Sequence, residues 1–171
     1  MKCPYCDFEN LDGMDLCGGC GADLAGLDLP AQRTDGVTRH FYEVTLADLD
    51  PAVPVTASPD TTVAEAIRLM RSLRHGAVFI LEDGRLTGIF TERDVLLRVC
   101  FGEHDIEAMP LREVMTPNPA TLRATAPLNQ ALNLMAVKGY RHVPVTDHGG
   151  QLIGFVSVRG VLRYLCDNVL I

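Results

Sequence analysis

Four of the six cysteines lie within the first 20 residues, where they form two C-x2-C pairs. Cys3 and Cys6 make up the first pair and Cys17 and Cys20 the second, with ten residues between the pairs. Two thiolates at this spacing can bind one metal ion from a tight turn, and two such turns complete a tetrahedral site. Four soft, negatively charged ligands favour zinc in a closed structural site, with no position for a catalytic water. Iron is the competing metal, and two disulfides or unpaired thiols are the alternatives without a metal.

A second set of residues able to bind a ligand occurs twice, in GIFTERD at 88–94 and in GFVSVRG at 154–160. The first copy has the residue types of a helix start, with Thr91 as N-cap and Asp94 reaching back to it. The same atoms suit a nucleotide. A helix N-terminus and Arg93 favour a phosphate, to which Thr91 is expected to donate, and the two oxygens of Asp94 match the two hydroxyls of a ribose. Helix capping and ligand binding remain two compatible interpretations.

The second copy differs from the first at one decisive position. It keeps the hydroxyl and the guanidinium, in Ser157 and Arg159, but it has Gly160 where the first copy has Asp94. The acceptor for a ribose is therefore missing. We expect one complete nucleoside site in the chain and one weak, altered or empty site.

Both motifs belong to a longer internal repeat, which extends over roughly 45 residues. Gly88 matches Gly154 at an offset of 66 residues, and Ala66 matches Ala131 at an offset of 65. One residue is therefore inserted in the second copy, near Gly139. A register kept over this length indicates that one supersecondary unit is present twice.

Each copy has the pattern of a β-α-β-β-α unit. In the first copy, apolar residues recur at helical spacing between 63 and 73, and Asp83–Gly84 is a strong hairpin signal between two apolar runs. The residues after each hairpin predict a second amphipathic helix. Cys100 and Cys166 fall late in these two helices, where we expect them as small buried side chains.

Two parts of the chain resemble known families. The stretch CPYCDFENLDGMDLCGGCGADL resembles a short zinc ribbon. The segments SPDTTVAEAIRLM, GAVFILEDGRLTGIFTERDVL, VMTPNPATL and YRHVPVTDHGGQLIGFVSVRGVL resemble a tandem pair of CBS (cystathionine β-synthase) domains, also called a Bateman module. The predicted fold class is α+β, with two CBS units packed as a pseudo-twofold pair and a small N-terminal ribbon. The predicted parts are the ribbon, a linker, CBS unit 1 and CBS unit 2, at 1–25, 26–42, 43–104 and 105–171.

The CBS resemblance implies a regulatory module, not an enzyme, that binds AMP, ADP, ATP or S-adenosylmethionine in clefts between its units and pairs into dimers. For the first cleft it agrees with phosphate at Thr91 and ribose at Asp94. The implied adenine contacts are Ile89, Thr121, Arg141 and His142, with His75 and Gly76 at the matching place in unit 1. The implied residues of the second cleft are Thr56, His75, Val156, Ser157 and Arg159. The alternative for both histidines is a surface or half-buried side chain without a ligand.

Charge and hydropathy limit the partners. The chain carries a formal net charge of −7, and residues 1–32 have one base against six acids. Nucleic-acid affinity depends on Lys and Arg that neutralise phosphates, so this acidic ribbon argues against DNA or RNA. No stretch approaches the ~20 apolar residues of a membrane helix, and no apolar signal segment follows Met1. We expect a cytoplasmic protein without membrane contact, whose thiols stay reduced.

The leading hypothesis for function is a sensor, in which the adenosine ligand shifts the packing of the units or of the dimer. An unidentified partner protein would read this change through the oligomer or the ribbon. The alternatives are a nucleic-acid-linked transcriptional regulator, which the acidic ribbon disfavours, and a structural adaptor with empty clefts. An enzyme is disfavoured, because the sequence has no G-x-S-x-G, no P-loop, no paired catalytic carboxylates and no open metal site.

Overall fold

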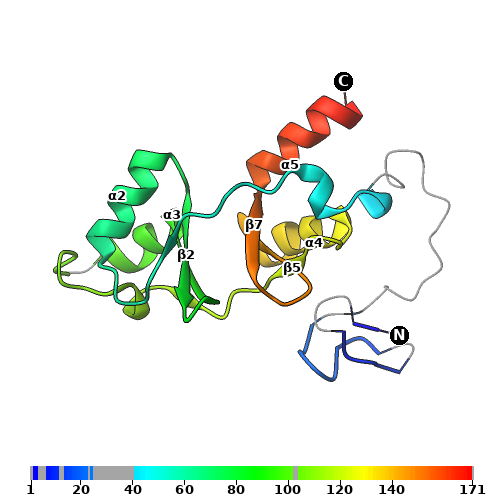
Figure 1. The fold of residues 1–171 in the computed structure, drawn as a ribbon, viewed down its shortest axis with the longest axis horizontal. Helices are drawn as coiled ribbons and strands as arrows, with labels where there is room; N and C mark the ends of the chain where they lie inside the picture. The colour runs from blue at the N-terminus through cyan, green and yellow to red at the C-terminus, as the bar shows by residue number, and fades with distance from the viewer. Residues whose placement is uncertain are drawn as a thin grey trace.

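The computed structural model describes residues 2–3, 7–11, 14–22, 24, 41–101 and 104–170. Figure 1 shows two lobes side by side, with the N-terminal segment next to the second lobe. Cys6 lies outside the described residues, and so does the predicted linker at 26–42, apart from its last two positions. The two lobes hold the two copies of the repeat, and we call them unit 1 and unit 2.

Unit 1 follows the predicted β-α-β-β-α order. Its elements are β1 (Thr56–Ala57), α2 (Val63–Leu73), β2 (Ala77–Glu82), β3 (Arg85–Thr91) and α3 (Glu92–Asp94), which continues as the π-helix η2 (Val95–Val99). Strands β1 and β2 are parallel, and β2 and β3 are antiparallel. Asp83 and Gly84 join β2 to β3 with φ angles of 49° and 76°, as a two-residue hairpin turn requires.

Helix α2 begins and packs as its sequence predicts. Thr62 is the N-cap, and its hydroxyl accepts the N–H of Glu65 at 3.2 Å. The carboxylate of Glu65 in turn accepts the N–H of Thr62 at 3.1 Å, which completes a capping box. Val63, Ala66 and Met70 are buried along one face of the helix. The apolar residues that recur at helical spacing in the sequence therefore form the face that covers the sheet.

Unit 2 repeats this order. Its elements are β5 (Leu122–Arg123), α4 (Leu128–Lys138), β6 (His142–Thr146), β7 (Leu152–Ser157) and α5 (Val158–Leu165), which continues as the π-helix η4 (Cys166–Leu170). Helix α4 ends at Gly139, whose φ of 70° is the left-handed conformation that favours glycine at a C-cap. The hairpins of the two units have their irregular pairing at matching places, after Ile80 and after Val145, which are 65 positions apart. Their partners Gly88 and Gly154 are 66 positions apart, so the inserted residue lies in the turn between β6 and β7, and the prediction that it lies near Gly139 is wrong.

Unit 2 is completed by the chain that precedes unit 1. The short helix η1 (Leu46–Leu49) packs on unit 2, where the N–H of Leu46 donates to the carbonyl of Ala126 at 2.9 Å. Ala52 and Phe155 exchange a pair of backbone hydrogen bonds at 2.9 and 3.1 Å. In Figure 1 this cyan segment runs past α5 and then crosses to the first lobe.

Unit 1 is completed in the same way by the chain that precedes unit 2. Strand β4 (Thr116–Pro117) pairs antiparallel with β3, and η3 (Leu111–Glu113) precedes it. The side chains of Leu111 and Val114 belong to the core of unit 1. These contacts cross the predicted boundary at 105, because residues 46–52 pack on unit 2 and residues 111–117 pack on unit 1.

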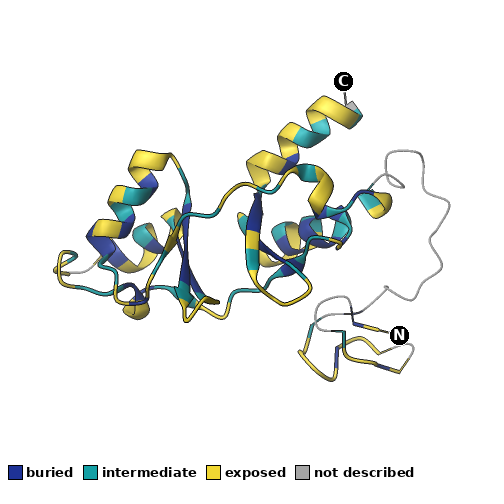
Figure 2. Cartoon of the chain, viewed as in Figure 1, coloured by how far each residue is buried: buried dark blue, intermediate teal, exposed yellow. Residues whose placement is uncertain are grey.

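The two sheets pack against each other through the faces that their helices leave free. Along β2, Val78 and Ile80 belong to the core of unit 1, while Ala77 and Phe79 face unit 2. The rings of Phe79 and Phe155 lie 5.1 Å apart across the contact. Figure 2 shows the strands buried and the outer helix faces exposed, so the middle of the molecule is a second apolar layer between the units.

The second helix of each unit is present as predicted, but it continues as a π-helix, which the sequence pattern does not predict. Val99 faces the core and is 8% exposed, so the neighbouring Cys100 points away from it. Cys100 and Cys166 are both exposed, and the prediction that they are buried is wrong. None of the helices within the described ranges is long and apolar enough to cross a membrane.

Candidate functional site

A cleft of about 460 Å³ lies where the turn from β3 into α3 meets the turn between α4 and β6 of the other unit. The bridging segment 116–120 forms its third side. The sequence-predicted residues that line this cleft are Gly76, Ile89, Thr91, Arg93, Asp94, Arg141 and His142. The tertiary fold therefore brings together residues of both units that are about 50 positions apart in the sequence.

Asp94 is the most buried polar side chain of the cleft, at 8% exposure. Its Oδ2 accepts the N–H of Thr91 at 2.9 Å and the hydroxyl of Thr91 at 2.6 Å. Its Oδ1 accepts the hydroxyl of Thr116 at 3.4 Å and lies 3.5 Å from the Nε of Arg98. The capping box predicted for this position is present, and it holds the carboxylate at the cleft.

Thr91 has the predicted N-cap role, and this role uses the hydroxyl that the second interpretation assigns to a phosphate. Its hydroxyl donates to Asp94 and accepts the N–H of Asp94 at 3.4 Å. The predicted donation from Thr91 to a phosphate would require Asp94 to release that hydrogen. In unit 2 the matching hydroxyl, of Ser157, accepts the N–H of Gly160 at 3.1 Å, and Gly160 stands at the position of Asp94.

Basic side chains dominate the charge of the cleft. Four cations line it against the two acids Glu92 and Asp94, and the cations are Arg93, Arg98, Lys138 and Arg141. Arg98 is partly committed, because its guanidinium also donates to the carbonyls of Val114 and Met115 at 2.8 Å each. The local excess of positive charge contrasts with the net charge of −7 for the whole chain, and such a site favours an anion.

His142 packs on the backbone of Gly76 at the inner end of the cleft. A Cβ at position 76 would lie 3.0 Å from the imidazole, so a side chain there would press on the ring of His142. Burial lowers the pKa of His142; nearby Glu92 opposes this shift, and the charges of Arg141 and His75 add to it. The Nδ1 of His142 is buried without a hydrogen-bond partner in the described part of the chain. The ring is therefore neutral near pH 7.

Three predicted residues lie elsewhere. Thr121 lines a neighbouring cavity, and His75 packs edge-on against Phe155 at 5.7 Å, outside the lining of the first cleft. A cavity of about 430 Å³ contains Val156, Ser157, Arg159 and Gly160, as expected for the second site. Thr56 and His75 do not line that cavity, which is formed by unit 2 and by residues 48–52.

Sequence reasoning missed several lining residues of the first cleft. The polar ones are Glu92, Arg98, Thr116, Asn118, Lys138 and Tyr140. The VMTPNP segment contained a signal, because it is the most specific part of the CBS resemblance and supplies Thr116 and Asn118. No local signal marks Lys138 or Tyr140, since only the packing of unit 2 against unit 1 brings them to the cleft.

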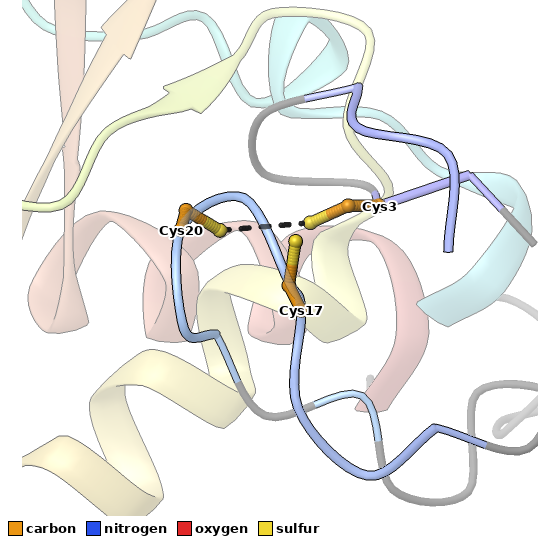
Figure 3. Close-up of side chains that lie close together, drawn as sticks. All are labelled: Cys3, Cys17 and Cys20. Carbon is orange, nitrogen blue, oxygen red and sulfur yellow. Dashed lines mark hydrogen bonds between the residues drawn. The ribbon is translucent and has the colours of Figure 1, made fainter. Parts of the chain in front are cut away.

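The described cysteines of the N-terminal segment form a cluster. The sulfurs of Cys3, Cys17 and Cys20 all lie within 4.8 Å of one another, and Figure 3 shows them converging. The sulfurs of Cys3 and Cys20 are 3.8 Å apart. Zinc–sulfur bonds of ~2.3 Å place the corners of a tetrahedron roughly 3.8 Å apart, so these side chains fit a metal site.

Buried Asn10 organises the second cysteine turn. Its amide donates to the sulfur of Cys17 at 3.5 Å, and its carbonyl accepts the N–H of Gly18 at 2.8 Å. Burial raises the pKa of the Cys17 thiol. Hydrogen bonds from the backbone of Cys20 and Gly19 and from the side chain of Asn10 lower it by more than burial raises it, so the pKa is about 6. A thiolate is the form that binds a metal. No pattern in the sequence predicts this role for Asn10.

Comparison with known proteins identifies the fold family. The family model for the CBS domain matches twice, at residues 47–100 and 111–167. This chain belongs to the CBS domain family. Each CBS match covers one of the two lobes, so the internal repeat is a CBS pair.

Relatives of this CBS-domain protein match more than half of its length. An uncharacterized 17.7 kDa protein of Acidianus ambivalens is 32% identical over 110 residues, which are 64% of this chain and 65% of that relative. This chain therefore spans less than two thirds of that relative's length. The crystal structure of a CBS-domain containing protein from Agrobacterium tumefaciens has a TM-score of 0.65 and 29% identity, over 71% of this chain and 98% of the other. The cytosolic domain of the Mg²⁺ channel MgtE, solved in complex with ATP, has a TM-score of 0.54 and 26% identity, over 66% of this chain and 45% of the other.

Proposed function

We propose that this CBS pair is a sensor that binds an adenosine-containing ligand, AMP, ADP, ATP or S-adenosylmethionine, in the cleft at Thr91 and Asp94. The observation that carries the proposal is a cavity of about 460 Å³ with an excess of positive charge and one buried carboxylate. Cations suit phosphates, and a carboxylate suits the two hydroxyls of a ribose. The ATP complex of the related MgtE domain supports an adenine nucleotide.

Each side of the cleft has a role in this proposal. Asp94 accepts the ribose hydroxyls, and Arg93, Lys138 and Arg141 contact the phosphates. Ile89 and the neutral ring of His142 provide the apolar surface for adenine. The bound ligand contacts both units at once. It therefore stabilises one arrangement of the units over others, which is the requirement for a signal.

The remaining parts of the protein transmit the signal. We infer a homodimer, because exposed apolar residues lie on η2, just after it and on α5, namely Leu96, Leu97, Phe101 and Leu162. We infer structural zinc in the Cys3–Cys17–Cys20 cluster, with Cys6 as the fourth ligand. The dimer and the ribbon then provide surfaces that a regulated partner protein could recognise.

A thermal-shift screen with AMP, ADP, ATP and S-adenosylmethionine tests the ligand class. A ligand at 100 times its Kd stabilises the folded state by about 2.7 kcal/mol, which raises Tm by roughly 5–11 °C for a chain of this size. No shift with any of the four compounds would instead favour an adaptor with empty clefts.

Elemental analysis tests the metal site, and we expect one zinc ion per chain.

Calorimetry with the best ligand then tests the site. We expect one strong site per chain, and Asp94→Asn should weaken it roughly 10–150-fold, because a hydrogen bond to a charged group contributes about 1.5–3 kcal/mol. Asp83→Asn is the matched control, since it makes the same change in the exposed hairpin turn and should bind normally. Two equal sites, unchanged binding by Asp94→Asn, or steady turnover of ATP would contradict the proposal.

A further inference from the structure

A second cavity, of about 530 Å³, adjoins the cleft on the side of the N-terminal segment. Cys20, Gly21 and Ala22 line it together with the outer face of α4. It shares five lining residues with the cleft, and these are Asn118, Pro119, Ala120, Lys138 and Tyr140. The same short wall therefore faces the proposed nucleotide on one side and the cysteine turn on the other.

Backbone hydrogen bonds hold the cysteine turn, which comprises residues 17–22. The N–H of Gly21 donates to the carbonyl of Cys17 at 2.8 Å, and the N–H of Cys17 donates to that of Ala22 at 2.7 Å. A metal bound by Cys20, Cys17 and Cys3 would join this turn to the other end of the segment. A bound metal would therefore restrain residues 20–22 in their place against the cavity.

Contacts outside the cavity also hold the segment on unit 2. Asp7 forms an ion pair with Arg123 of β5. Lys138, at the last turn of α4, lies in the wall between the acidic segment and the cleft. Gly139 beside it packs near the guanidinium of Arg93, 3.7 Å from the position of a Cβ. Two cations of the cleft, Lys138 and Arg93, therefore lie in or beside the wall that the cysteine turn faces.

We propose that the cysteine turn 17–22 supports, from the second cavity, the wall that this cavity shares with the nucleotide site, and that metal binding and nucleotide binding strengthen each other. This inference rests on the proposed nucleotide function. Coupling between two sites must be reciprocal and typically changes affinities 5–150-fold. The metal-loaded turn keeps the shared wall ordered, so the ligand does not have to order it on binding.

The test compares zinc-loaded and chelator-stripped full-length protein by calorimetry with ATP and AMP. The stripped protein should bind at least fivefold more weakly. In the reverse direction, saturating AMP should slow the removal of zinc by a chelator; AMP is used because a triphosphate would itself bind the metal. Cys166→Ser, which removes an exposed thiol of η4, is the control and should behave as the unmodified chain.

A second variant guards against simple loss of folding in the stripped protein. Val137 is 68% exposed and lines the second cavity but not the cleft. Val137→Glu keeps all cysteines and places an acid against an acidic segment, so it should retain one zinc per chain and still weaken nucleotide binding. Val137→Ala should have a smaller effect.

The possible failures are distinguishable. Equal or tighter nucleotide binding after zinc removal, together with normal binding by Val137→Glu, overturns the coupling but leaves the nucleotide site in place. No binding by the zinc-loaded protein overturns the nucleotide function and the coupling with it.

Discussion

Positions 94 and 160 occupy the same place in the two units, so substitutions there can be read against each other. Gly160 is the third residue of α5, and its N–H already donates to Ser157. A Cβ at position 160 would lie 3.4 Å from the oxygen of Ser157, so a side chain fits. Gly160→Asp should rebuild in unit 2 the capping box that Thr91 and Asp94 form in unit 1.

The expected magnitude has two parts. Removing a glycine from a helix contributes about 0.5–1 kcal/mol, which Gly160→Ala measures alone. A carboxylate in the first helical turn adds about 0.3–1 kcal/mol through the N-terminal dipole and the new acceptor. Gly160→Asp should therefore raise the free energy of unfolding by about 1–2 kcal/mol. Asp94→Gly should lower it by about 2 kcal/mol, because it loses the N-cap partner and gains a helical glycine.

Urea unfolding of the ligand-free protein measures these differences, with Tm as a second reading at roughly 2–4 °C per kcal/mol. The decisive comparison is Gly160→Asp against Gly160→Ala, since only the carboxylate separates them. If the aspartate variant is no more stable than the alanine variant, the capping argument is wrong for unit 2. The same variant tested with nucleotide then shows whether a carboxylate alone creates a second ligand site.

Three further predictions concern the core, the cleft and the surface. Phe79→Ala should cost about 3–5 kcal/mol of unfolding free energy by urea titration, because this ring is fully buried between the units; a loss under 1 kcal/mol would contradict the inter-unit layer. Burial lowers the pKa of His142 in the folded chain, so the unfolded chain binds more protons below its pKa of ~6.5, and stability should fall as pH drops below that value. His142→Gln should flatten this dependence in melts between pH 5 and 7.5, and an unchanged slope would assign it to another group. Phe101→Glu, at a residue 86% exposed, should shift a dimer to monomer in sedimentation velocity, whereas an unmodified chain that is already monomeric would refute the proposed homodimer.

Much of this structure could be predicted from local sequence patterns. The repeat, the strand and helix order, the Asp83–Gly84 turn and the Thr91–Asp94 capping box each depend on residues a few positions apart. Such patterns act through backbone conformation and short-range hydrogen bonds, which neighbouring residues determine. The cysteine spacing is local in the same sense, and Cys3, Cys17 and Cys20 converge as that spacing predicts.

Tertiary packing decided the rest. Packing and backbone pairing between distant segments place η1 on unit 2 and β4 on unit 1. The packing of the two units also brings Lys138 and Tyr140 to the cleft. Val99 faces the core, so the neighbouring Cys100 lies on the exposed side. The sequence alone thus determined the two units and their candidate ligand groups, because these depend on local chemistry. The shape of the cleft and the position of the cysteine turn beside it depend on contacts between distant segments, which no local pattern encodes.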